Sequence, residues 1–164
     1  MDKRFSIIPP EKVERSLGRR VINYDMREAT EEEILREWQN SGRAEMEGDE
    51  PTEDFKVMNK YVYNRIEVAM GQWSYDGIIN AIIRDKYRID EMEAITNNMA
   101  AVNAVFMQTL VTEGILEATR YLKESIDDDN TARFKEMQEW RALAKSVASE
   151  VIAYAKEQSM LVES

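Results

Sequence analysis

Apolar residues recur every seven positions along the last part of the chain, and this repeat constrains the fold more than any other feature. Its two interleaved registers are Met137, Ala144 and Val151, and Trp140, Val147, Tyr154 and Leu161. Residues at this spacing occupy the a and d positions of a helical seam, which packs against a second helix. The repeat therefore predicts a helix from about 131 to 158.

The segment before it, residues 99–124, predicts another long helix with an unusually wide apolar surface. Its apolar residues cover one side first and then drift to another: Val102, Val105, Phe106, Leu110, Val111, Ile115, Ala118 and Leu122. A helix that is apolar around most of its circumference lies at the centre of a bundle or is buried in an oligomer. Gly114 inside such a helix costs roughly 1 kcal/mol relative to alanine, which indicates close packing there. With shorter helices expected over 75–86 and 90–98, residues 71–164 form a helical domain.

Residues 18–70 predict a small strand–helix–strand element. Alternation with a period of two indicates strands in RVINYDMRE and in the segment from 61 to 68. Between them, Thr30 and Glu33 have the spacing of a capping box, which begins a helix, and the acidic loop 43–54 follows. The expected fold class is therefore mainly α: a helical bundle with long C-terminal helices and a small N-terminal two-stranded αβ element.

Residues 1–17 are expected to form an extended N-terminal arm. Pro9 and Pro10 forbid helix at this point and favour extended backbone. Three apolar residues precede them: Phe5, Ile7 and Ile8. These side chains either dock on a neighbouring subunit or lie back on their own domain, and the sequence leaves both readings open.

Two residue types that serve most catalytic and metal sites are missing, since the chain has no cysteine and no histidine. Disulfides, thiolate or imidazole metal ligands and the Ser–His–Asp triad are therefore excluded. The six glycines form no phosphate-binding loop. The acidic run at 127–129 lacks the alternate spacing and the glycine of a calcium loop. We expect no enzymatic activity, no cofactor and no metal site.

Charge argues against nucleic acid and membrane partners. The net charge is −10, from 32 acidic and 22 basic residues, and a domain this acidic repels phosphate groups and anionic lipid. The helices expected over 75–86 and 90–98 have the lengths of a helix-turn-helix, but the second contains no arginine to read bases. No apolar run approaches the roughly 18 residues of a membrane span, and the N-terminal residues lack the apolar core of a secretion signal. We therefore expect no sequence-specific nucleic acid binding and no membrane insertion.

Three parts of the sequence resemble a known group of proteins: RRVINYDMREATEEE near the start, SYDGIINAIIRDKY with DEMEAITNN in the middle, and FKEMQEWRALAK near the end. Together they cover about fifty residues. They are similar to small structural-type proteins of tailed bacteriophages and prophages of gut Bacteroidetes, including crAss-like phages. The resemblance implies a role in the virion or its assembly, with assembly in the host cytoplasm, and it implies no catalytic residues.

These features favour a non-enzymatic structural or assembly protein of a tailed phage virion, such as a capsid, portal or tail accessory component. Its partners would be other virion proteins and further copies of itself, which it would contact through its helices. The expected contact residues are Phe5, Ile7 and Ile8 in the arm and Met137, Trp140, Val147, Val151 and Tyr154 on the seam. The alternative is an acidic regulatory module that blocks a basic surface of a host protein. A carboxylate-based enzyme is a third hypothesis, which would need a pocket with two acids of raised pKa.

Overall fold

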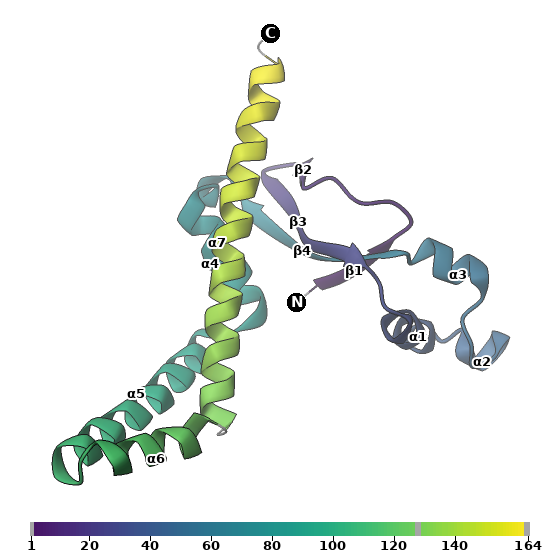
Figure 1. The fold of residues 1–164 in the computed structure, drawn as a ribbon. Coiled ribbons are helices and arrows are strands. Elements are labelled where there is room, and N and C mark those ends of the chain that lie inside the picture. Colours follow the sequence, from purple (N-terminus) through teal and green to yellow (C-terminus); the bar gives the residue numbers. More distant parts are fainter. Residues whose placement is uncertain (1, 127–128, 163–164) are drawn as a thin grey trace. The chain divides into compact units, whose positions relative to one another are not determined.

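The computed structural model describes residues 2–126 and 129–162, with only the backbone for residues 126 and 159–162. Figure 1 shows the elements, which are β1 (Asp2–Ser6), β2 (Val13–Ser16), β3 (Arg19–Glu28), α1 (Glu31–Asn40), α2 (Ala44–Glu47), α3 (Glu53–Met58), β4 (Tyr61–Ala69), the 3-10 helix η1 (Met70–Gln72), α4 (Tyr75–Lys86), α5 (Ile89–Thr112), α6 (Ile115–Ile126) and α7 (Asp129–Val162). The chain is mainly helical with long C-terminal helices, as the sequence predicts. It divides into two compact units: the first unit comprises Met1–Ala81 and Val147–Ser164, and the second comprises Ile82–Ser146.

The sheet of the first unit has four strands, so the predicted two-stranded element is wrong. Its order is β1-β4-β3-β2, and every neighbouring pair is antiparallel. The two additional strands come from residues 1–17, the predicted arm: β1 pairs with β4 and β2 pairs with β3. Both are short, polar strands at the edges of the sheet, where one neighbour suffices. They are too short and too polar to show the alternation that reveals β3 and β4.

The centre of β3 is buried on both faces. Four consecutive residues are at most 4% exposed: Val21, Ile22, Asn23 and Tyr24. The loop before β2 covers one of these faces, because the Asn23 amide donates to the Glu11 carbonyl at 2.8 Å and to the Glu14 carboxylate at 2.6 Å. A bulge then interrupts the β3–β4 register between Tyr24 and Arg27, with Asp25 at a φ of 52°. The period-two alternation expected for this strand, with one face buried and the other exposed, therefore does not describe its centre.

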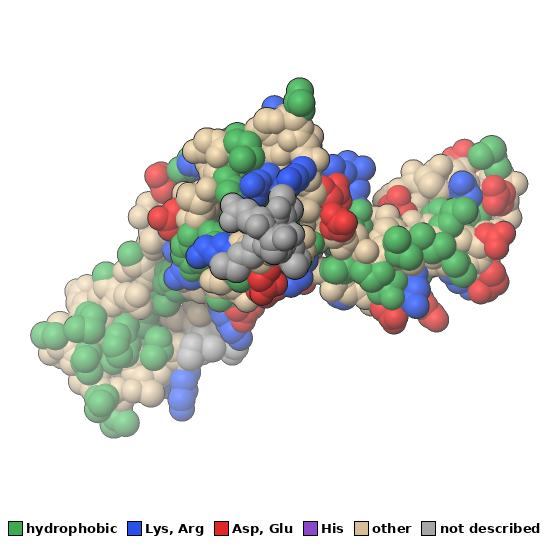
Figure 2. Space-filling view, turned by 90° about the horizontal axis from the view of Figure 1, so that it is seen from above, with side chains coloured by type: hydrophobic (Ala, Val, Ile, Leu, Met, Phe, Trp, Pro, Cys, Tyr) green, Lys and Arg blue, Asp and Glu red, His purple; other side chains and the backbone are tan. Residues whose placement is uncertain are grey.

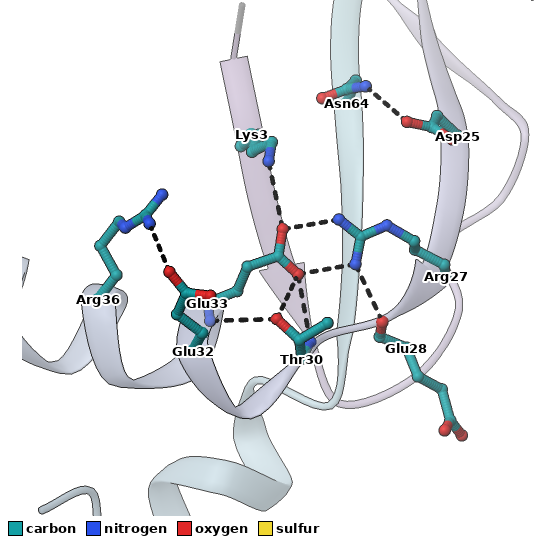
Figure 3. A network of polar contacts seen from close by, with 9 residues as sticks. All are labelled: Lys3, Asp25, Arg27, Glu28, Thr30, Glu32, Glu33, Arg36 and Asn64. Atoms are coloured by element: carbon teal, nitrogen blue, oxygen red, sulfur yellow. Dashed lines mark hydrogen bonds and ion pairs between the residues drawn. The ribbon is translucent and has the colours of Figure 1, made fainter.

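α1 begins with the predicted capping box. Thr30 accepts a hydrogen bond from the Glu33 backbone N–H at 3.3 Å, and the Thr30 N–H donates to the Glu33 carboxylate at 3.2 Å. That carboxylate also accepts two hydrogen bonds from Arg27 of β3, at 2.6 and 2.7 Å, and one from Lys3 of β1 at 3.3 Å (Figure 3). The Arg27 guanidinium is the main reason that the pKa of Glu33 lies well below its usual range. One carboxylate thus joins α1 to two strands.

A small aromatic core holds α1 to the segment expected to be a loop. Trp38 is fully buried and meets the Phe55 ring edge-on, with 4.9 Å between ring centroids. Ile34 completes this core, and the Trp38 indole N–H donates to the Gly48 carbonyl at 2.8 Å. Residues 43–54 are therefore not one loop: they contain α2 and the start of α3.

The second unit contains a helical hairpin where the sequence predicts one continuous helix over 99–124. α5 begins at Ile89, passes through Asn97 and Asn98 without a break, and ends at Thr112. Gly114 then adopts a φ of 91°, in the left-handed region, and α6 starts at the next residue. The N–H groups of Glu113 and Gly114 both donate to the Thr109 carbonyl, at 2.8 and 3.2 Å. Gly114 is thus the glycine that closes a helix C-terminus, rather than a close-packing residue inside one.

The heptad helix is present as α7, and its seam is part of the core. In the second unit, the Trp140 indole N–H donates to the Ile82 carbonyl at 3.0 Å. Lys86 lies 4.6 Å from the centroid of the Trp140 ring and forms a 2.7 Å ion pair with Glu136. α7 is therefore fixed to the end of α4 by an aromatic, a cation and a carboxylate; the Leu161 side chain lies outside the described residues.

Candidate functional site

The contact residues predicted on α7 are mostly enclosed by the chain itself. Met137 is 0% exposed, Val151 2%, Val147 7% and Trp140 9%. Tyr154 is half-buried. In this conformation the first four side chains pack inside the molecule and offer no free surface to a partner. Any contact surface must therefore be sought elsewhere on the helices.

The predicted arm is built into the sheet, and its most exposed apolar residues before the β2–β3 turn lie in the loop between β1 and β2. Phe5 is half-buried in β1, opposite Val62 of β4. Ile7 and Ile8 follow the strand and expose 54% and 68% of their surface. Of the three arm residues, two therefore remain available to a partner. Removing residues 1–17 would also remove two strands, so such a truncation tests folding as well as docking.

The most exposed group of large apolar side chains in the second unit lies where α5 turns into α6. We call this group the hairpin surface, and its members are Val105, Met107, Val111, Ile115 and Leu116. Their exposed fractions run from 43% for Val105 to 82% for Val111 and Leu116. Figure 2 shows hydrophobic side chains gathered over this end of the hairpin. Clustered apolar exposure of this kind marks an interaction site more often than scattered single residues do.

The hairpin surface is also almost free of charge. Residues 94–112 contain no Asp, Glu, Lys or Arg, although these make up 33% of the chain. Three exposed alanines, Ala100, Ala101 and Ala104, lie on the same helix. Small side chains let another helix approach closely, and the absence of charge removes the desolvation cost of burying ionic groups. The end of the hairpin is therefore suited to contact with another apolar surface.

A second candidate lies in the first unit, where α7 passes the end of the sheet. A hollow of about 400 Å³ is lined by Glu11, Val13, Arg15, Arg20, Tyr154, Ala155 and Gln158. Arg15 of β2 and Arg20 of β3 are direct cross-strand partners, so their side chains lie on the same face of the sheet. The Arg20 guanidinium lies 4.5 Å from the centroid of the Trp73 ring. We call this site the arginine hollow.

Acidic residues form no metal-ligand group in the part of the chain that the structure describes. No three of them are grouped as metal ligands there, and Asp127 and Asp128 lie outside it. The arginine hollow contains one carboxylate, that of Glu11. A second hollow of about 250 Å³, beside α1 and α3, contains two, Glu31 and Glu50, together with Lys56. None of the described helices combines the length and the apolar character needed to cross a membrane.

The sequence predicts contact residues in neither the hairpin surface nor the β2–β3 part of the arginine hollow, for different reasons. The uncharged run 94–112 is visible in the sequence, and the wide apolar helix expected there follows from it. The sequence did not predict the turn at Gly114, which places that surface at the end of a hairpin. The arginine hollow depends on the pairing of β2 with β3, and β2 has only four residues.

Comparison of this chain with protein-family models, with curated proteins and with solved structures found no match. The assignment of function therefore depends on the two sites and on the sequence patterns above.

Proposed function

We propose that this chain is a non-enzymatic assembly protein of a tailed phage virion that associates through its hairpin surface. The observation that carries the proposal is the group of five large, exposed apolar side chains at the end of a helical hairpin whose first helix has no charged residue from 94 to 112. The phage context is supported by the three stretches that resemble virion-type proteins. The seam of α7 is not part of this proposal, because its side chains are buried.

A second copy of the chain is the partner that charge favours. Two molecules of net charge −10 repel each other, and the repulsion is smallest where neither surface carries charge. The hairpin surface comes closest to that condition, because its five side chains are apolar and residues 94–112 are uncharged, and a twofold contact makes one patch complementary to itself. An anionic lipid surface is disfavoured, because the charged residues that flank the turn, Glu113 and Glu117, are both acidic.

Sedimentation equilibrium over a range of protein concentrations tests self-association. We expect the wild-type chain to associate and Leu116→Lys to raise the dissociation constant roughly tenfold or more, because burial of a leucine contributes about 1.5–3 kcal/mol. Leu17→Lys is the matched control: Leu17 is an exposed leucine like Leu116, but it lies in the β2–β3 turn of the first unit. A wild-type chain that stays monomeric at all concentrations, or equal weakening by both substitutions, contradicts the proposal. Binding to anionic vesicles without self-association contradicts it as well.

The virion assignment needs a separate measurement. Mass spectrometry of purified phage particles should find this chain at a fixed ratio to the major capsid protein. Its absence from particles, together with salt-sensitive capture of a basic host protein, would favour the acidic regulatory module instead.

A further inference from the structure

The arginine hollow contains an electrostatic arrangement that the fold does not need. Arg15 and Arg20 are direct cross-strand partners, which places their Cβ atoms about 4.5–5.5 Å apart. Like charges in this position destabilise a sheet. An acidic residue at either position would turn this repulsion into an ion pair, and the chain has 32 acidic residues. The presence of two arginines beside a hollow therefore calls for an explanation.

Two basic residues beside this pair, Lys12 and Arg19, are matched with carboxylates, and Arg15 is not. Lys12 pairs with Glu150 at 2.9 Å, and Arg19 pairs with Glu67 at 2.8 Å. Arg20 is held by its stacking on Trp73, which leaves the N–H groups at the edge of its guanidinium able to donate. Within the described part of the chain, no ion pair is found for Arg15. The hollow thus presents one oriented and one unpaired guanidinium.

The backbone beside this pair is also open. β2 is the last strand in the order β1-β4-β3-β2, so among the described residues it pairs with β3 alone. The outer side of an edge strand presents N–H and C=O groups to which another extended chain can add. A strand added there would place one residue beside Arg15 and, two positions away on the same face, another beside Val13.

We propose that an extended acidic segment of another protein adds to β2 and places a carboxylate beside Arg15, on the side away from Arg20. The row of neighbouring side chains then runs from the incoming carboxylate through Arg15 to Arg20, and the like-charge contact is neutralised. An apolar residue two positions from the carboxylate lies against Val13, which is half-buried and lines the same hollow. This surface belongs to the first unit and does not depend on the hairpin surface.

A synthetic peptide tests the proposal with the full-length chain. The probe is a capped, fluorescently labelled nine-residue peptide of alternating valine and threonine that begins and ends with valine, with a glutamate in the central valine position, so that valines lie two positions to either side of it. Its partner probe has glutamine at that position. We expect the glutamate peptide to bind, and either the glutamine peptide or Arg15→Gln to weaken binding at least about tenfold, since a charge-assisted hydrogen bond is lost. Arg15→Lys should restore part of the affinity.

Arg36→Gln is the control for net charge. Arg36 lies on α1, its side chain is 67% exposed, and its partner is Glu32. This substitution should leave the affinity for the glutamate peptide unchanged, and equal weakening by Arg36→Gln and Arg15→Gln would overturn the proposal. Hydrogen exchange supplies a second readout: the bound peptide should slow exchange of amide protons in residues 13–16, and unchanged exchange there would overturn strand addition. Inorganic phosphate that binds while both peptides fail would assign the hollow to a small oxyanion instead.

Discussion

At the scale of single residues, the Glu33 carboxylate makes more contacts in the first unit than the capping-box motif alone predicts. The capping box predicts only that Glu33 closes on Thr30. In the structure, Glu33 also bonds to Arg27 and Lys3, and its side chain is only 16% exposed. Burial alone would raise the pKa of this group, and the Arg27 hydrogen bonds outweigh that effect.

Glu33→Gln should therefore lower stability in a manner that depends on pH. The folded-state pKa of Glu33 lies below the ordinary value of 4.5, so the unfolded chain binds more protons as the pH falls below that value. The stabilisation is fully present above pH 4.5 and is lost as the pH falls toward the folded-state pKa. We expect a cost of roughly 1–3 kcal/mol at neutral pH, and a smaller difference from wild type in acid.

Urea unfolding at neutral pH and at several values below the ordinary glutamate pKa measures this difference. Glu32→Gln is the control, because Glu32 is 81% exposed and pairs only within its own helix. A gap between Glu33→Gln and wild type that stays constant with pH would show that the carboxylate charge is not what stabilises the unit.

At the scale of elements, the sequence predicts most of what lies in long, regular segments and little of what depends on turns or edges. β4, α1 and α7 have strong periodicity, and each is found close to its expected place. β1 and β2 are specified by their pairing partners rather than by their own four or five residues. A glycine within a helical pattern, such as Gly114, is compatible with either a helix interior or a helix end. Only the backbone conformation distinguishes the two.

Gly114→Ala should destabilise the hairpin through its backbone alone. No heavy atom lies within 4 Å of a Cβ placed at Gly114, but its φ of 91° is unfavourable for any residue with a side chain. We expect the free energy of unfolding to fall by roughly 1–2 kcal/mol. Gly71→Ala is the matched control, since Gly71 also has open space and no left-handed φ. Thermal unfolding compares the two, and a loss at Gly71 as large as that at Gly114 would contradict the conformational explanation.

At the scale of the whole molecule, the net charge opposes association between copies and the exposed apolar surface favours it. A net charge of −10 keeps copies apart in solution, while the hairpin surface leaves large apolar side chains exposed to water. The two are compatible if contact is restricted to the apolar side chains at the end of the hairpin. Charge then excludes other modes of association and selects this one.

Self-association through that surface should make thermal stability depend on protein concentration. A partner that binds only the folded chain stabilises it by mass action, so a tenfold rise in concentration adds up to about 1.4 kcal/mol per dimer contact. Shared between two chains this is about 0.7 kcal/mol each, so for a chain of this size we expect the melting temperature of the wild type to rise by roughly 1–3 °C for that change. For Leu116→Lys the dependence should begin only at concentrations roughly tenfold or more higher than for the wild type, whereas Leu17→Lys should keep the wild-type dependence. Added salt should strengthen the dependence in the wild type, because screening reduces the repulsion between two acidic copies while the apolar contact is unaffected. A wild-type melting temperature that ignores both concentration and salt would mean that the hairpin surface is not covered by a second copy.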